Sequence, residues 1–457
     1  MTPNGDRRPN IVMIVADDHG REAVGCYGNP VVSTPNIDRL AASGVRFDNA
    51  FCTTASCSAS RSVILTGLHN HTNRTYGLVH EPHHFSMSSQ IQTLPALMKR
   101  AGYRTGRMGK KHYRPEELFP FDFDPAEWAT EEDVLRRRDD VRLADRCAQF
   151  VQGESPYFLY WCSHDPHRNW ERKDHPLRPD DFGNPTTSFP GDEEEAFEPD
   201  AVIVPPWLPD LPEVRAETAE YYQSIARLDR GVGRLMDLIE SAGSDRDTVI
   251  LYLSDNGAAF PVAKTTLYEP GMQLPLIVRD ARRSVAGARC AALVTWADLA
   301  PTVLDLAGAP ELAEPMFGES LVPFLDAPET PGREHVFASH SFHQITNYYP
   351  MRVVRTHRWK FLYNIAWKLD FPTASDLHAS ATWRSTVRES SQLGARDVDS
   401  YLHRPRFELY DLAADPHELE NLADDPAQSE RVAGFVTLIQ NFQLATGDPW
   451  FHKWIYE

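Results

Sequence analysis

The chain has 457 residues, of which 42% are hydrophobic and 24% charged, as in an ordinary globular protein. Its formal net charge of −19 argues against nucleic acid as a partner, because phosphate binding needs a basic surface. No run of about 18 apolar residues and no secretory signal is seen, and the six scattered cysteines suit a reducing compartment, so we expect a cytoplasmic protein without a membrane span.

Strands and helices alternate along the first three quarters of the chain. Continuous apolar or β-branched runs, typical of a sheet buried on both faces, predict strands at 11–16, 156–162 and 248–253. Further strands are expected at 45–51, 103–109 and 274–278. Amphipathic patterns with helix start and stop signals predict helices at 34–41, 94–101, 216–242 and 296–307. The Pro-rich, acidic segment 171–212 shows no periodicity, and we expect it to wrap around a site entrance.

The pattern changes after about residue 345. Residues 351–364 and 407–411 alternate between apolar and polar like antiparallel strands, and 428–445 is typical of a closing helix. The sequence therefore predicts an α/β protein with a large, mixed but mostly parallel sheet flanked by helices in residues 1–345. A smaller α+β domain built on an antiparallel sheet would follow in residues 346–457.

Four predicted strands end in polar clusters. These clusters are Asp17 and Asp18, Lys110 and His112, His164, and Asp255 and Asn256. Ligands of an open α/β sheet bind outside the carboxyl ends of its strands, so parallel neighbours would bring the clusters into one crevice. Each cluster alone is also compatible with ordinary turn chemistry.

The residue types in these clusters suggest three roles, namely binding a cation, binding an anion and transferring protons. Oxygen ligands that suit Ca²⁺ or Mg²⁺ come from Asp17, Asp18, Asp255 and Asn256. Cations that could hold a tetrahedral anion are Arg61, Lys110 and Lys264, although a solvated Lys264 remains an alternative. His112 and His164 have side chains that can act as base and acid near neutral pH. Together they predict sulfuryl or phosphoryl transfer.

The stretch 54–67 carries a lone cysteine, Cys57, among small hydroxyl residues. Arg61 follows four residues later, and the run from Ser60 predicts a helix whose free N–H groups would face the same anion as the arginine. A nucleophile at position 57 would then lie on top of that anion. A half-buried structural cysteine before an ordinary helix is the alternative.

These residues resemble the type I sulfatases of the alkaline-phosphatase superfamily. The family signature Cys-x-Pro-Ser-Arg, followed by Thr-Gly, is similar to 57–61 with Thr66-Gly67. The Gly-Lys-x-His element is similar to 109–112, and the two metal motifs are similar to Asp17-Asp18 and 254–257. Resemblance to the sulfamidase branch, N-sulfoglucosamine sulfohydrolase, is carried by 76–78, 83–85, 164–168, 349–352, 408–411 and 415–418.

The resemblance implies an alkaline-phosphatase-like fold and a specific mechanism. A maturase would oxidise Cys57 to formylglycine, whose hydrate attacks sulfur. His164, with Lys264, would protonate the leaving group, and His112 would act as the base in sulfate release. Arg61 and Lys110 would stabilise the hydrate and the developing charge. One divalent cation, Ca²⁺ with Mg²⁺ or Mn²⁺ as alternatives, would be held by Asp17, Asp18, Asp255, Asn256 and residue 57.

Two residues depart from the family pattern. Ala59 replaces the signature proline, which points to a radical-type maturase, and Lys264 stands where a sulfamidase would carry arginine. We expect a small sulfated substrate, either an N-sulfo amino sugar or an aryl sulfate. His340, His343, Trp367 and the irregular segment 365–400 are candidates to shape the leaving-group side.

Three hypotheses about function remain open at this stage. The first is a sulfatase acting on a sulfamate or sulfate ester. The second is a phosphonate or phosphate diester hydrolase of the same superfamily, since phosphorus and sulfur centres are similar in charge and geometry. The third is a catalytically silent anion-binding protein. The sequence also leaves the oligomeric state open, a homo-oligomer included.

Overall fold

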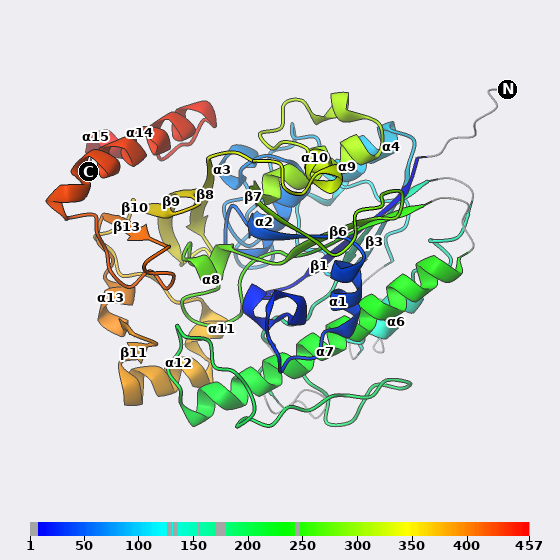
Figure 1. Cartoon of the computed structure of the whole chain (residues 1–457), viewed down its shortest axis with the longest axis horizontal. Coiled ribbons are helices and arrows are strands. Elements are labelled where there is room, and N and C mark those ends of the chain that lie inside the picture. The colour runs from blue at the N-terminus through cyan, green and yellow to red at the C-terminus, as the bar shows by residue number, and fades with distance from the viewer. Residues whose placement is uncertain are drawn as a thin grey trace.

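The computed structural model describes residues 8–125, 130, 136–153, 156–169, 180–242 and 247–456. A seven-stranded sheet forms its centre, in the order β3-β4-β1-β5-β6-β2-β7 (Figure 1). Only β6 runs antiparallel to its neighbours, β5 and β2, so the predicted mixed and mostly parallel sheet is confirmed. The strands are β1 (Asn10–Ala16), β2 (Val45–Phe51), β3 (Arg104–Gly109), β4 (Tyr157–Cys162), β5 (Thr248–Ser254), β6 (Leu276–Asp280) and β7 (Ala288–Thr295).

The central strands are apolar at nearly every position, and successive side chains point to opposite faces of the sheet. In β1, Ile11, Met13 and Val15 belong to the core on one face. Val12 and Ile14 belong to the core on the other face. A sheet with this pattern is stable only when both of its faces are covered by helices.

Helices cover both faces of the sheet. α1 (Pro35–Ala42), α6 (Asp140–Asp145) and α7 (Pro212–Ser241) pack on one face, at the bottom of Figure 1. α2 (Cys57–Ile64), α4 (Leu94–Arg100), α9 (Leu299–Leu306) and α10 (Val322–Asp326) pack on the other. Two short helices, α3 (Asn70–Asn73) and α8 (Glu269–Met272), lie in the connections.

A second, antiparallel sheet follows in the order β13-β10-β9-β8. Its strands are β8 (His335–Phe342), β9 (Tyr348–Thr356), β10 (Trp359–Asn364) and β13 (Phe407–Asp411). One face packs on α14 (Ser429–Ala445) in a separate small core, and the other joins the large core through Met351 and Val353. The remaining elements are α11 (Ser375–His378), α12 (Ala381–Ser385), β11 (Gln392–Leu393), β12 (Arg396–Asp397), α13 (Val398–Leu402) and α15 (Lys453–Tyr456).

Buried ion pairs join the second sheet to the first. Glu269 of α8 accepts from Arg355 of β9 at 3.0 Å and from Lys360 of β10 at 3.1 Å. The division into domains at residue 345 stays a prediction, and β8, which lies before that position, pairs with β9 after it. The two sheets are therefore held as one packed unit.

Strands β7 and β8 were not predicted from the sequence. Each lies at the end of its sheet, and each mixes small, basic or hydroxyl residues with its apolar ones. Such strands lack the continuous apolar run of a central strand, because an edge strand is less completely enclosed. The described part of the predicted loop, residues 180–211, contains neither helix nor strand, as expected.

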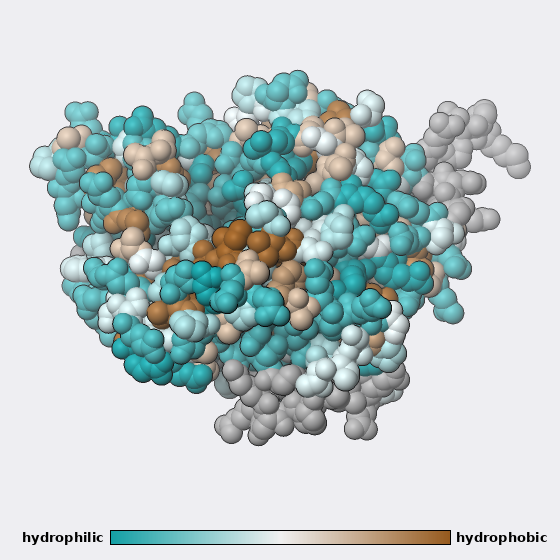
Figure 2. All heavy atoms as spheres, turned by 60° about the horizontal axis from the view of Figure 1, so that its bottom comes forward, coloured by the Kyte–Doolittle hydropathy of each residue, from teal (hydrophilic) through white to brown (hydrophobic). Residues whose placement is uncertain are grey.

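Hydrophilic residues make up most of the surface in Figure 2. The largest apolar patch on this face lies near its centre, and smaller apolar spots are scattered around it. Within the part of the chain that the structure describes, no helix combines the length and the apolar character needed to cross a membrane.

Candidate active site

The carboxyl ends of β1 and β5 place three carboxylates together. These strands are parallel neighbours, so Asp17 and Asp18 after β1 meet Asp255 after β5. One ligand atom from each of these carboxylates, together with the sulfur of Cys57, lies within 4.8 Å of the others. The structure therefore brings the acidic part of the predicted cation site together.

Asn256 adds an amide to this group. Its Nδ2 donates to Asp255 Oδ1 at 3.0 Å and approaches Cys57 Sγ at 3.5 Å. Its Oδ1 is buried without a hydrogen-bond partner, which is costly unless another group satisfies it. Carboxylate and amide oxygens are the donors that Ca²⁺ and Mg²⁺ prefer, so these residues fit a divalent cation.

The acidic residues differ in their pKa values. Burial raises the pKa of Asp255 to about 7 and that of Asp18 to about 6, and neighbouring carboxylates add to both shifts. Burial acts on Asp17 as well, but the ammonium group of Lys110 and other nearby cations hold the pKa of Asp17 well below its usual range. A bound cation would favour the ionised form of all three carboxyl groups.

Cys57 is the first residue of α2, so the helix begins three residues before the predicted start at Ser60. Ser56 before it is extended, and the backbone N–H of Ser60 donates to the Ser56 carbonyl at 2.7 Å. The intervening Ser58 and Ala59 are completely buried, and their small size allows this first turn to pack inside the protein. The burial of this first turn therefore extends α2 toward its N-terminus, which the local sequence alone does not indicate.

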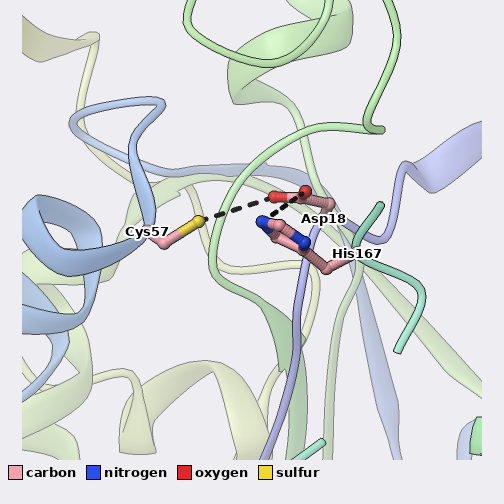
Figure 3. Close-up of side chains that lie close together, drawn as sticks. All are labelled: Asp18, Cys57 and His167. Carbon is pink, nitrogen blue, oxygen red and sulfur yellow. Dashed lines mark hydrogen bonds and ion pairs between the residues drawn. The ribbon is translucent and has the colours of Figure 1, made fainter. Parts of the chain in front are cut away.

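The side chains of Cys57, Asp18 and His167 point toward one another (Figure 3). The sulfur of Cys57 lies 3.7 Å from Asp18 Oδ1 and is completely buried. Burial raises the pKa of the Cys57 thiol well above its ordinary value. Because the thiolate is the reactive form, an unmodified Cys57 would be a weak nucleophile here.

Arg61 lies one helical turn after Cys57 and faces the same acidic residues. Its Nε donates to Asp255 Oδ2 at 2.8 Å, and its Nη2 donates to Asp17 Oδ1 at 3.5 Å. Its Nη1 is buried without a hydrogen-bond partner in the structure. Arg61 therefore keeps one buried nitrogen whose N–H groups have no protein acceptor.

Lys110 approaches the same carboxylates from the end of β3. Its Nζ donates to Asp17 Oδ2. Gly109 makes this position reachable, because its φ is +79° and a Cβ at this point would lie 1.8 Å from the carbonyl oxygen of Cys162. Only glycine fits such a turn without displacing the backbone.

Lys264 is buried and forms three contacts. Its Nζ donates to Asp18 Oδ2 at 2.8 Å and to Asp376 Oδ2 at 2.7 Å, and it lies 3.0 Å from His167 Nε2. The alternative of a solvated lysine is therefore wrong, because its side chain is 0% exposed. Neither His167 nor Asp376 was predicted as a site residue.

The sequence held a signal for His167 but none for Asp376. His167 belongs to the same His-Asp-Pro-His segment as His164, so its position three residues later was an available signal. Asp376 lies in an irregular segment without periodicity, and only its tertiary contact with Lys264 reveals it.

The two predicted acid–base histidines line a common cavity of about 550 Å³ with Cys57. The ring of His112 stacks on that of His80, with centroids 5.2 Å apart. Burial, and next the charge of Lys110, lowers the pKa of His112 well below its usual value, so this ring is neutral at pH 7. A neutral imidazole can accept a proton, as a general base must.

The second sheet and the segment after it complete the cavity wall. His343 lines the cavity as predicted, and Ser375 and Asp376 represent the segment 365–400. His340 and Trp367 are not among the lining residues, and neither is any described residue of 180–211. That segment packs along α7 instead, for example through Arg230 Nη2 and Asp192 Oδ2 at 3.0 Å.

Two family models match the chain. The model described as Sulfatase matches residues 9–309, which include the predicted site from Asp17 to Lys264. The chain belongs to the sulfatase family. A second model, described as N-sulphoglucosamine sulphohydrolase, C-terminal, matches residues 261–381, which include Lys264 and Asp376.

Individual relatives agree with this family. The chain is 36% identical over 466 residues to human N-sulphoglucosamine sulphohydrolase, covering 97% of this chain and 91% of the relative. It is 27% identical to an ulvan-active sulfatase of Formosa agariphila, with 96% and 81% covered. The protein is therefore a sulfamidase-like sulfatase, an enzyme that hydrolyses sulfate esters or sulfamates.

Solved structures share the fold. A protein solved in complex with its substrate D-glucosamine-2-N,6-O-disulfate superposes with a TM-score of 0.68 at 21% identity, covering 97% of this chain and 99% of that chain. A phosphonate monoester hydrolase of Agrobacterium radiobacter gives a TM-score of 0.67 at 20% identity, with 96% of each chain covered. Both likenesses concern the architecture, and they confirm the predicted alkaline-phosphatase-like fold.

Proposed function

We propose that this sulfatase hydrolyses the N-sulfate of an amino sugar, with residue 57 as the nucleophile. The observation that carries the proposal is the position of Cys57, which lies against the acidic cation site and lines the cavity. A cavity of about 550 Å³ can enclose one sugar ring. The similarity to human N-sulphoglucosamine sulphohydrolase over 97% of the chain supports the substrate class.

In this proposal, a maturase converts Cys57 to formylglycine, which the sulfatase family generally uses. The raised pKa of the buried thiol supports the conversion, because the unmodified side chain would stay protonated and weakly nucleophilic. Ala59, in place of the signature proline, favours a radical-type maturase over the oxygen-dependent enzyme.

The proposed cation is Ca²⁺, with Mg²⁺ and Mn²⁺ as alternatives. Asp17, Asp18, Asp255 and Asn256 would hold it, and the buried, unpartnered Oδ1 of Asn256 supports this ligand set. When bound, the cation supplies positive charge that offsets the negative charge of the sulfate and of the nucleophile.

The remaining side chains of the site would either bind the charged sulfate group or transfer protons. Arg61 and Lys110 flank the acidic site and would hold the anionic sulfate group beside residue 57. His112, neutral at pH 7 and with its Nδ1 buried without a partner, would take up the proton. His164, on the cavity wall, would give a proton to the leaving group. Lys264, whose three contacts are all with protein groups, would position its neighbours.

Mass spectrometry of the tryptic peptide from Phe47 to Arg61 tests the chemistry at position 57. In protein made in its own host, we expect an aldehyde in place of the thiol. The same preparation should release sulfate from N-sulfoglucosamine, and Cys57→Ala should not. An unmodified thiol, or turnover of a phosphonate monoester in preference to both N-sulfoglucosamine and an aryl sulfate, would contradict the proposal.

The cellular setting stays a prediction. We propose a cytoplasmic location and transient interaction of the unfolded chain with the maturase. Light scattering coupled to size exclusion will distinguish a monomer from a homo-oligomer.

A further inference from the structure

Asp376 joins the active site from the C-terminal part of the chain. It belongs to the short helix α11, which follows the second sheet's strand β10, and it lines the same cavity as Cys57. Its Oδ2 accepts from Lys264 at 2.7 Å, and its Oδ1 accepts from the backbone N–H of Leu377 at 3.0 Å. The carboxylate is therefore held in one orientation at the cavity wall.

The contacts of Lys264 bear on whether Lys264 or Asp376 is available to a substrate at this wall of the cavity. An ammonium group has three N–H donors, and those of Lys264 face Asp18, Asp376 and His167. Its side chain is 0% exposed, whereas that of Asp376 is 13% exposed. Both residues line the cavity, but Asp376 is the more exposed of the two, and the donors of Lys264 already have protein partners.

The state of His167 agrees with this arrangement. Its Nδ1 approaches the carbonyl oxygen of Arg168, which can only accept, so Nδ1 carries the proton. Its Nε2 is then free to accept from Lys264. Lys264 thus joins Asp376, His167 and Asp18, a proposed cation ligand, in one group of hydrogen bonds.

The two substrate classes of a sulfatase differ at the atom that leaves. The bridging nitrogen of a sulfamate carries an N–H, whereas the bridging oxygen of a sulfate ester carries only lone pairs. In a sulfamate, the acid first gives its proton to the bridging nitrogen, which becomes positively charged. An S–O bond then forms to the nucleophile as the S–N bond breaks, and the nitrogen keeps the electron pair and leaves as a neutral amine. A nearby carboxylate favours this N–H and repels an oxygen that gains negative charge.

We propose that Asp376 is a specificity-determining residue that makes the enzyme prefer sulfamates to sulfate esters. Its carboxylate accepts a hydrogen bond from the leaving nitrogen and stabilises the positive charge that develops on this nitrogen. The inference rests on the proposed function, because it assigns the substrate preference of the same site.

The experiment compares kcat/KM for N-sulfoglucosamine and for 4-nitrophenyl sulfate. We expect Asp376→Asn to lower the ratio of the two kcat/KM values at least about tenfold, the scale of one charge-assisted hydrogen bond. Asp376→Glu, which keeps the carboxylate, should restore part of the preference. Asp370→Asn is the matched control, because Asp370 is an exposed carboxylate of the same segment, 365–400, that does not line the cavity, and it should change the ratio less than about twofold.

The outcomes separate this inference from the proposed function. A ratio of kcat/KM values that stays unchanged in Asp376→Asn would overturn the role of Asp376. This includes an equal loss of kcat/KM for both substrates, because a merely structural residue affects both reactions alike. Wild-type protein that cleaves only the ester would contradict both the proposed N-sulfate substrate and the inference, whereas wild-type turnover of N-sulfoglucosamine with an unchanged ratio in Asp376→Asn would overturn the inference alone. Wild-type protein, shown to carry the aldehyde, that cleaves neither substrate would contradict the proposed function itself. Thermal melting of each variant checks folding, and Asp376→Ser supplies the same comparison should the asparagine variant be unstable.

Discussion

Asn256 shows what a single atom can reveal about a cation site. Three carboxylates gather beside it, and its own Oδ1 is buried without a partner. Since the amide nitrogen is already bonded to Asp255, the amide cannot turn to satisfy the oxygen without losing that bond. An oxygen ligand for a cation is the simplest account of this orientation.

We therefore predict that Asn256→Ala weakens Ca²⁺ binding at least about tenfold, since one ligand is lost from a small set. Calorimetric titration of protein stripped of divalent ions with a chelator measures the affinity directly. Asn49→Ala is the matched control, because Asn49 donates from the same type of amide to the carbonyl of Ala291 on the outer part of the sheet. Equal Ca²⁺ affinity of Asn256→Ala and wild type would show that the amide is not a ligand.

Among single site residues, those that directly follow a predicted strand could be found from the sequence. Those whose position depends on contacts with residues far along the chain could not. Asp17 and Asp255 could be found because each follows a clearly apolar strand, and Lys110 because it follows the predicted strand 103–109. Asp376 could not be singled out within the segment 365–400, because only its contact with Lys264, 112 residues away, distinguishes it.

At the scale of elements, the site depends on how strands end. β3 stops at Gly109, where the chain adopts φ +79° and turns directly under the carbonyl of Cys162 on β4. The turn brings Lys110 back toward Asp17 at the end of β1. β1 and β4 were predictable from their apolar runs, whereas the position of this turn at the end of β3 against a neighbouring carbonyl is a property of the packed sheet.

Gly109→Ala should therefore lower the free energy of unfolding by roughly 3 kcal/mol or more, since it combines a positive φ with a backbone clash. Gly191→Ala is the matched control, because Gly191 has φ +82° but nothing within 4 Å of its added Cβ. The control should lose only about 1 kcal/mol. Urea unfolding of both variants measures the difference, and equal losses would mean that the sheet relaxes around the added methyl group.

At the scale of the whole molecule, several histidines are buried away from solvent. Burial lowers the pKa of His19 to about 4, of His69 to about 4 and of His340 to about 3. The unfolded chain binds protons at these side chains near pH 6.5, whereas the folded chain does not. Their contribution to stability is complete above pH 6.5 and is lost as the pH falls toward 4.

We expect the free energy of unfolding to fall between pH 7 and pH 5, with about 2 kcal/mol of the loss for each such histidine. His69→Phe tests one of them, because His69 already packs among Phe317 and Phe442. The loss between the two pH values, measured by urea unfolding, should be smaller in the variant by about 2 kcal/mol. A pH dependence identical to that of the wild type would show that His69 does not titrate differently in the folded chain.

The complete burial of Cys57 also sets an order of events in time. An enzyme that modifies this side chain cannot reach it once α2 is packed, and Asp376, part of the cavity wall, is made long after it. The ribosome adds the roughly 300 residues between them in about 15 to 60 s. Maturation would therefore compete with folding, and a host that folds this chain quickly would yield less aldehyde than one that folds it slowly.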